Sequence, residues 1–437
     1  MCGCRWIPGR THRPGSSSPL VTVPCGDLLI RRIGRLVPMT GPPIADAALV
    51  ARAGRVAWIG LERELPAAVG EMPSVDAGGA AVIPGFVDAH THLVWAGSRR
   101  TEFEARLTGV PYDGGGIATT VAATRQASTE ELIELTRERA AAALATGTTT
   151  LEIKTGYGLT VEAELRLLDA INAVAADVPQ RVEATYLGAH AVPPGRDRAG
   201  YVAEVISTLP AARALGARWC DVFCDRGAFT VAEARQILTA AAAQGLGGRL
   251  HADQIERLGA VPLAAELGCA SADHLDRIDE EGAAALARSG TVAVLVPTAT
   301  LTMRTQDWHQ ARTLQAAGAT IALATDCNPG TSWTESMPYV VQLACLALGM
   351  SVEEALRGAT LHGARALRRA DLGHLGVGAV ADAAVLAAEH EVDLVAHLGA
   401  AAVRDVVIGG VVVSGSRPAQ DPSPDQSSSA SSASTST

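Results

Sequence analysis

The central part of the chain alternates short apolar runs with helix-start signals, a pattern typical of parallel strands joined by helices. Sequences of the capping-box type, beginning at Ser128, Thr230 and Ser351, predict helix starts between the runs. The apolar runs predict eight strands, which end near His90, Lys154, His190, Phe223, His251, His274, Pro297 and Asp326. We therefore predict an α/β fold with a (β/α)8 TIM-like barrel, whose active site lies at the carboxyl ends of the strands.

Short alternating patterns at both ends of the chain predict a second, smaller domain. Strands are expected within 27–33, 48–60 with a hairpin turn at Gly54, and 80–83, and again within 383–386 and 403–413. The prediction is one small β-sandwich formed by residues 24–80 and 378–415, with the metal-dependent barrel, 81–377, inserted between them. Residues 1–23 and the Ser-rich tail 416–437 are too polar and irregular to bury a core, so we expect both to be disordered.

Composition and charge exclude some classes of protein. The 437 residues are 48% hydrophobic and 19% charged, an ordinary globular composition. A formal net charge of −10 argues against a nucleic-acid partner or an anionic membrane surface, because both require concentrated positive charge. The longest uncharged run, 336–352, contains Pro338 and is shorter than the ~20 residues of a membrane-spanning helix. We therefore expect neither a nucleic-acid partner nor a membrane-spanning segment.

Cysteine usage bears on the cellular compartment. Eight cysteines without a secretory hydrophobic segment favour reduced thiols and a cytoplasmic protein. Two close pairs, Cys2 with Cys4 and Cys220 with Cys224, each lack the second pair that a zinc finger requires.

Histidines at the predicted strand ends suggest a metal site. His90 and His92 enclose one threonine, so on a strand their side chains point to the same face and reach one ion. Such a pair alone often only caps a sheet edge. Here His251, His274 and Asp326 close other predicted strands. Three imidazoles and a carboxylate suit zinc or iron, with one coordination position left open for water.

Longer motifs surround these residues and carry a family resemblance. They are PGFVDAHTH at 84–92, HTHLVWAGSR at 90–99, EIKTGYGL at 152–159, LHADQ at 250–254 and ATDCNPGT at 324–331. The chain resembles the amidohydrolase superfamily through the first motif. The other four together resemble the imidazolonepropionase family within it, and the similarity runs from about residue 25 to 415.

The resemblance implies an activity and roles for particular residues. Members of that family hydrolyse the cyclic amide of 4-imidazolone-5-propanoate to N-formimino-L-glutamate in histidine degradation, using metal-activated water. One zinc or iron ion per subunit is implied, with His90, His92, His251 and Asp326 as ligands and with His274 and Asp326 as catalytic residues. Contacts with the substrate or product are implied for Arg99, Tyr157, His190, Gln254, Asn328, Gly330 and Thr331.

The chain departs from the family pattern at two places. Gln254 stands where some members carry a glutamate with an acid/base role, which a carboxamide cannot perform. The segment 109–117 is shorter than is usual in the family, and loops of this kind cover the mouth of a barrel.

Other interpretations stay open at this stage. The same metal ligands serve deaminases that release ammonia from aromatic rings, and a non-catalytic barrel would keep the fold without the activity. His274 would have a purely structural role if it were hydrogen-bonded to Asp273 or Asp276, and Arg99 would have one in a surface charge cluster. Lys154 invites comparison with carboxylated lysines that bridge two metals. A homodimer is one assembly that the sequence allows.

Overall fold

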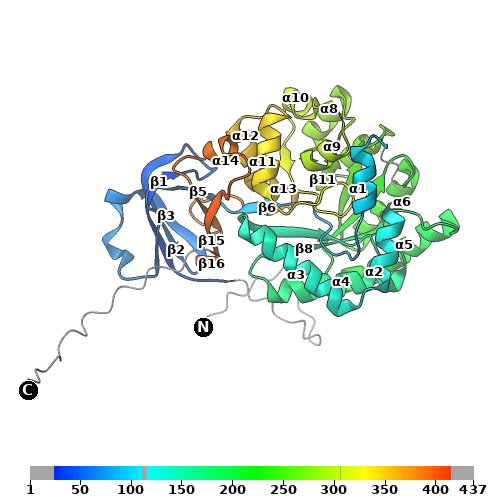
Figure 1. Cartoon of the computed structure of the whole chain (residues 1–437), viewed down its shortest axis with the longest axis horizontal. Coiled ribbons are helices and arrows are strands. Elements are labelled where there is room, and N and C mark those ends of the chain that lie inside the picture. Colours follow the sequence, from blue (N-terminus) through cyan, green and yellow to red (C-terminus); the bar gives the residue numbers. More distant parts are fainter. Residues whose placement is uncertain (1–23, 111–115, 306, 415–437) are drawn as a thin grey trace, which may run out of the picture.

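The computed structural model describes residues 24–110, 116–305 and 307–414, which form two eight-stranded sheets flanked by helices (Figure 1). The disorder expected for both chain ends concerns residues outside the described ranges. Residues 111–115 of the shortened loop also lie outside the described ranges, as do Cys2 and Cys4.

The first sheet is the predicted barrel. Its strands pair in chain order and in parallel: β6 (Phe86–Asp88), β7 (Thr148–Lys154), β8 (Arg181–Ala189), β9 (Trp219–Cys224), β10 (Gly247–Ala252), β11 (Ser271–His274), β12 (Val292–Leu295) and β13 (Ile321–Leu323). The ring is closed beyond β6 and β13, where the Asp326 N–H donates to the His90 carbonyl at 3.0 Å and the His92 N–H donates to the Cys327 carbonyl at 2.9 Å. This closure brings the first and last strand ends together.

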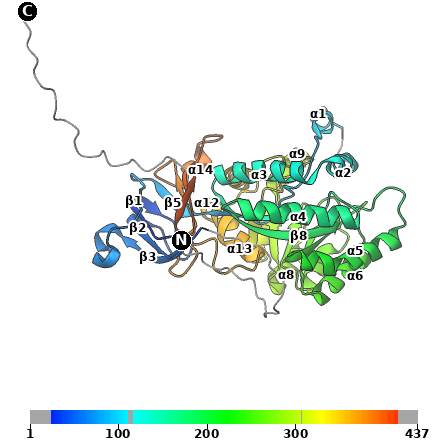
Figure 2. The ribbon, with the colours of Figure 1, turned by 90° about the horizontal axis from the view of Figure 1, so that it is seen from below.

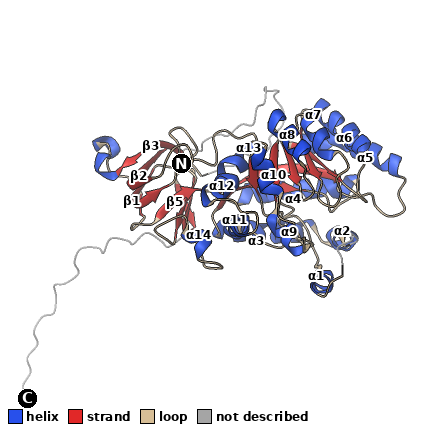
Figure 3. Ribbon diagram, turned by 90° about the horizontal axis from the view of Figure 1, so that it is seen from above, coloured by secondary structure: helices blue, strands red, loops and turns tan. Residues whose placement is uncertain are grey.

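Helices cover the outside of the barrel (Figures 2 and 3). They are α3 (Thr129–Ala145), α4 (Val161–Asp177), α5 (Arg198–Ala214), α6 (Val231–Ala243), α7 (Ala260–Glu266), α8 (Glu280–Ser289), α10 (Gln310–Ala316), α11 (Met337–Leu346), α12 (Val352–Arg357) and α13 (Gly363–Ala366). Thr230 and Ser351 form the predicted capping boxes, whereas Ser128 caps α3 through a single bond from the Glu131 N–H. Three more helices follow strand ends: α1 (Arg100–Leu107), α2 (Ile117–Gln126) and α9 (Pro297–Thr302).

The second sheet is formed by both ends of the described chain, as predicted. Its order is β16-β15-β14-β5-β1-β2-β3, with β4 paired to β1. In Figure 1 the blue strands β1–β3 lie beside the orange-red β15 and β16. The bounds are β1 (Leu28–Leu36), β2 (Ile44–Arg52), β3 (Arg55–Leu61), β4 (Ser74–Asp76), β5 (Ala81–Pro84), β14 (Ala383–Leu386), β15 (Val403–Ile408) and β16 (Val411–Ser414). A partly buried ion pair between Arg181 of β8 and Asp382, which precedes β14, ties the barrel to this sheet.

Two further expectations have structural outcomes. Cys25 is disulfide-bonded, so the expectation of reduced thiols is wrong at that position, because spacing along a chain does not reveal which cysteines approach in space. Free thiols are found at Cys220, Cys224, Cys269, Cys327 and Cys345. Within the described ranges, no helix has the length and apolar character needed to cross a bilayer.

Candidate metal centre

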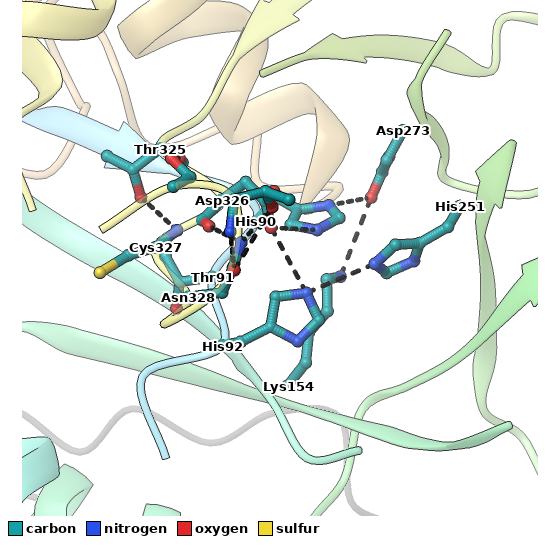
Figure 4. A network of polar contacts seen from close by, with 12 residues as sticks. His90, Thr91, His92, Lys154, His251, Asp273, Thr325, Asp326, Cys327 and Asn328 are labelled. Atoms are coloured by element: carbon teal, nitrogen blue, oxygen red, sulfur yellow. Dashed lines mark hydrogen bonds and ion pairs between the residues drawn. The ribbon is translucent and has the colours of Figure 1, made fainter. Parts of the chain in front are cut away.

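Four side chains from three strand ends converge inside the barrel mouth: His90 and His92 follow β6, His251 lies on β10, and Asp326 follows β13. Figure 4 shows His90, His92, His251 and Asp326 turned toward one another. The Nε2 atoms of His92 and His251 are 3.4 Å apart. Asp326 Oδ1 lies 3.4 Å from His90 Nε2 and 3.5 Å from His92 Nε2. All four residues are at most 3% exposed, so their donor atoms form a buried set.

The three separations above, between His92 and His251 and from Asp326 to His90 and His92, are those expected between neighbouring ligands of one tetrahedral ion. Donor atoms held 2.0–2.2 Å from a tetrahedral zinc lie roughly 3.3–3.6 Å from one another. His90 Nε2 is buried and has no hydrogen-bond partner among the described residues. A dication at the centre would satisfy this nitrogen and offset the close approach of the other donors. The residues present therefore fit the metal that the resemblance implies.

Two carboxylates behind the histidines select the ring form that binds metal. His90 Nδ1 lies 2.7 Å from Asp273 Oδ2, and His251 Nδ1 lies 3.1 Å from Asp221 Oδ1. Because a carboxylate only accepts, each Nδ1 carries the proton and each Nε2 presents its lone pair to the centre. Burial also lowers the pKa of His90 and His92 well below the usual value, which favours neutral imidazoles.

A layer of buried charges supports these carboxylates. Lys154 Nζ lies 2.8 Å from both Glu152 and Asp221, and Arg249 lies 3.3 Å from Asp273. All five side chains are fully buried. Although burial opposes its charge, Asp221 and Glu152 raise the pKa of Lys154. A charged ammonium held in this way contradicts the carboxylated-lysine alternative, because a carbamate would face two carboxylates.

Asp273→Asn is expected to weaken metal binding by about 10- to 100-fold while the fold is retained, the usual cost of losing an outer partner of a ligand histidine. Asparagine has nearly the shape of aspartate but lacks the charge that faces His90, Lys154 and Arg249. Chelator competition measures the change. Asp393→Asn, at an exposed carboxylate, serves as control. Wild-type metal affinity in Asp273→Asn would contradict the supporting role.

His274 lies beside the ligand histidines. Its ring centroid is 5.3 Å from that of His90 and 5.1 Å from that of His251. Its Nδ1 is buried and, among the described residues, has no hydrogen-bond partner. The alternative in which Asp273 or Asp276 holds this ring is therefore not observed, and the nitrogen is available to a bound molecule.

His190 and Tyr157 lie on the other side of His92. The His190 ring stacks on His92 with centroids 5.2 Å apart, and Tyr157 lies 5.3 Å from His190. His190 Nδ1 donates to the Gly156 carbonyl at 2.9 Å. Burial lowers the pKa of His190 to about 4, so the ring is neutral and Nε2 is an acceptor.

The turn that carries Tyr157 is fixed by a residue that the sequence did not suggest. Glu164, at the start of α4, accepts the backbone N–H groups of Gly156, Gly158 and Leu159 at 2.7–2.9 Å. Asp225 does the same for the segment after β10, because it accepts the N–H of Gln254 at 2.8 Å. The buried carboxylates thus hold both segments in place.

Arg99 is buried rather than part of a solvated charge cluster. It is 5% exposed and makes two bonds to Glu102, at 2.6 and 2.8 Å. A Cβ on Gly330 would lie 2.2 Å from Arg99 Nη1, and one on Gly116 would lie 2.4 Å from Nη2. Glycine at both positions lets the backbone pack directly against the guanidinium.

The loop after β13 is organised by Asn328. Its Oδ1 accepts the N–H groups of Gly330 and Thr331, both at 2.8 Å, and its Nδ2 donates to the Asp326 carbonyl at 2.7 Å. The amide is thus engaged within the loop and orients the segment next to the metal ligand. The Thr331 hydroxyl donates a hydrogen bond to the same Asn328 Oδ1.

Gln254 follows β10 and contacts Met303 through its side chain. It is 6% exposed, and its Nε2 donates to the sulfur of Met303 at 3.4 Å, a weak acceptor. Within the described ranges, this sulfur is the acceptor found for the Gln254 carboxamide. The family resemblance predicts a substrate contact for Gln254, whereas its contact with Met303 was not predicted from the sequence.

Comparison with known proteins gives a consistent picture. A model of the amidohydrolase family matches residues 81–413. A Streptomyces avermitilis protein named imidazolonepropionase is 50% identical over 365 residues, which cover 83% of this chain and 86% of that protein. One of the same name from Mycolicibacterium smegmatis is 46% identical over 397 residues and covers 88% and 97%.

Solved structures share the fold at low identity. An adenosine deaminase from Xanthomonas campestris with bound zinc has a TM-score of 0.67 and 20% identity, covering 89% of this chain and 92% of that one. A mutant atrazine chlorohydrolase from Arthrobacter aurescens, complexed with zinc and atraton, has a TM-score of 0.70 and 18% identity, covering 89% and 95%. At these identities the likeness concerns the fold alone.

Proposed function

The chain belongs to the imidazolonepropionase family of amidohydrolases, and on that premise we propose how the centre described above performs a metal-dependent ring opening. The enzyme is a hydrolase that cleaves the cyclic amide C–N bond of 4-imidazolone-5-propanoate and yields N-formimino-L-glutamate. Two groups of possible ligands share His90, namely His90 with His92 and Asp326, and His90 with His251 and His274; their convergence is the observation that carries the proposal.

We propose zinc or iron as the ion, one per subunit. Three imidazole nitrogens and one carboxylate oxygen suit either metal, whereas magnesium and calcium prefer all-oxygen sites. When bound, such an ion supplies Lewis-acid chemistry, since it lowers the pKa of water from 15.7 toward about 7 and polarises a carbonyl group.

The proton transfers are assigned to Asp326 and His274. Water forms a bond to the ring carbonyl carbon, the C–N bond breaks, and the ring nitrogen needs a proton. The Asp326 carboxylate, 3.4 and 3.5 Å from His90 and His92, accepts a proton from that water and delivers it to the leaving nitrogen. His274, whose Nδ1 has no hydrogen-bond partner among the described residues, shares this proton work and stabilises the negative charge that develops on the carbonyl oxygen.

The remaining residues bind the substrate in this proposal. The Arg99 guanidinium, which binds the Glu102 carboxylate through Nε and Nη2, pairs with the propanoate arm when substrate binds, because a guanidinium is a natural partner for a carboxylate. His190 Nε2 accepts a ring N–H, Tyr157 lies over the ring beside it, and Gln254 orients the ring by hydrogen bonding.

Loss of the ultraviolet absorbance of imidazolonepropanoate on addition of the purified, metal-loaded protein tests the activity. The same samples are assayed for ammonia, because an aromatic-ring deaminase releases it and ring opening does not. Stable absorbance would contradict the proposal, and stoichiometric ammonia would favour the deaminase alternative.

Arg99→Ala is expected to raise KM about 10- to 100-fold with unchanged metal content, because a charge-assisted contact worth roughly 1.5–3 kcal/mol is lost. Arg99→Lys should recover only part of the loss. Because the alanine variant leaves Glu102 unpaired, Arg99→Ala/Glu102→Gln should show the same rise. Arg100→Ala, at the exposed neighbour, is the control. Wild-type KM in all variants would mean that the propanoate binds elsewhere.

A further inference from the structure

We propose that a cavity at the amino-terminal end of the barrel, opposite the metal centre, binds a small organic ligand carrying two negative charges on oxyanion groups. The cavity measures ≈ 510 Å³ and is lined by the first residues of β8, β9 and β10, by α4, by the last turn of α5, and by the segments after α5 and α13. This volume is within the range of about 300–1,000 Å³ found for small-molecule sites. Nothing in the ring-opening reaction requires it.

Positive charge is concentrated in this cavity although the chain has a net charge of −10. The walls carry one carboxylate, that of Glu183, and four arginines, which are Arg213, Arg218, Arg368 and Arg369. Glu183 is paired with Arg218 at 2.8 Å and with Arg369 at 3.3 Å. The only carboxylate on the walls is therefore already shared between two guanidinium groups.

The other two arginines have no carboxylate partner among the described residues. Arg213 reaches only the Ala217 carbonyl, at 3.5 Å, and Arg368 donates one Nη2 bond to the Gly268 carbonyl at 2.6 Å. Both side chains are exposed at the cavity, with most of their donor groups left for a ligand. An arginine pairs with a carboxylate or a phosphate through two parallel hydrogen bonds. Two arginines of this kind therefore suit a ligand with two negative charges.

The buried indole of Trp219 forms an apolar part of the cavity wall. Trp219 is 2% exposed, and the Arg218 guanidinium lies 5.2 Å from its ring centroid. A side chain at Gly247 would strike this indole, because a Cβ there would lie 2.4 Å from two ring carbons. The glycine therefore lets the indole lie flat against the strand, and the volume beyond it accommodates an organic portion of the ligand.

Thermal unfolding of the metal-loaded full chain tests the proposal. Inorganic phosphate and glutarate are titrated separately against sodium chloride at matched ionic strength. A ligand that binds only the folded state raises Tm in a saturable way. We expect at least one of the two probes to do so, with calorimetry giving one site per chain. A response to phosphate alone indicates a phosphoryl ligand, and a response to glutarate alone indicates a dicarboxylate.

The variant R213Q/R368Q keeps both aliphatic stems and removes the two unpaired charges. Its affinity for the responding probe should fall at least tenfold, while basal hydrolase activity, which reports correct folding, stays unchanged. R288Q/R312Q removes two exposed arginines of α8 and α10 that do not line the cavity and should respond like wild type. Equal responses to both probes and to chloride, or full affinity in R213Q/R368Q, would overturn the proposal.

Discussion

Replacing His92 with alanine is expected to remove the bound metal and the hydrolase activity together. His92 Nε2 lies 3.4 Å from His251 Nε2 and 3.5 Å from Asp326 Oδ1, so the substitution deletes a donor at the centre of the ligand set. The loss of metal affinity in His92→Ala should exceed the roughly 10- to 100-fold loss expected when an outer partner of a ligand, such as Asp273, is changed. Elemental analysis and the ultraviolet assay measure both effects on one preparation.

Thermal unfolding adds a readout that does not depend on turnover. A metal at 100 times its Kd stabilises the folded chain by about 2.7 kcal/mol, so a chelator should lower the Tm of the wild type. The same chelator should leave the Tm of His92→Ala nearly unchanged. His397→Ala removes an exposed imidazole far from the centre and should match the wild type. Full metal occupancy with full activity in His92→Ala would refute the ligand assignment.

His274→Ala is expected to lower kcat by about 10² to 10⁴, the range for a positioned acid or base, whereas Gln254→Ala should have a much smaller effect. The His274 ring lies about 5 Å from those of His90 and His251, with Nδ1 free for a reacting group. Gln254 cannot titrate, and its amide contacts a methionine sulfur. Metal content is measured in both variants, so that a loss of chemistry is distinguished from a loss of metal.

Gln254→Glu provides the matched test of the same assignment. If the carboxamide only orients the ring, the glutamate variant should be tolerated or mildly impaired, and the acidic limb of the pH–rate profile should not move. If a carboxylate is needed, the wild type should be slow and Gln254→Glu should accelerate it by about 10² to 10⁴. That acceleration, or greater damage from Gln254→Ala than from His274→Ala, would show that the acid/base role is misplaced.

The barrel was predictable because periodicity and strand ends are local properties. Each of the eight predicted strands is present, and the runs before His251 and His274 correspond to β10 and β11. A buried parallel strand needs a short apolar run, and a helix needs a capped start, so both leave a direct trace in the sequence. The individual strands at both chain ends were predictable for the same reason.

The supporting charge layer was not predicted, although a signal was present. Glu152 and Lys154 alternate on one face of β7, and Arg249 precedes His251 by two residues on β10. Charged residues inside otherwise apolar strands are rarely buried unless paired. Their spacing shows that they share a face, but not that Lys154 faces Asp221 on β9, since pairing across strands depends on register.

The sequence by itself determined which residues stand at strand ends, and therefore the histidines and the aspartate that can reach one ion. Only the tertiary structure decided that closure between β6 and β13 brings Asp326 within 3.4 Å of His90, a contact between residues far apart in the chain. It also decided that Asn328 holds its own loop and that Glu164 and Asp225 fix the neighbouring turns. Local pattern follows from backbone periodicity, whereas the partner of a buried polar group depends on how distant segments pack.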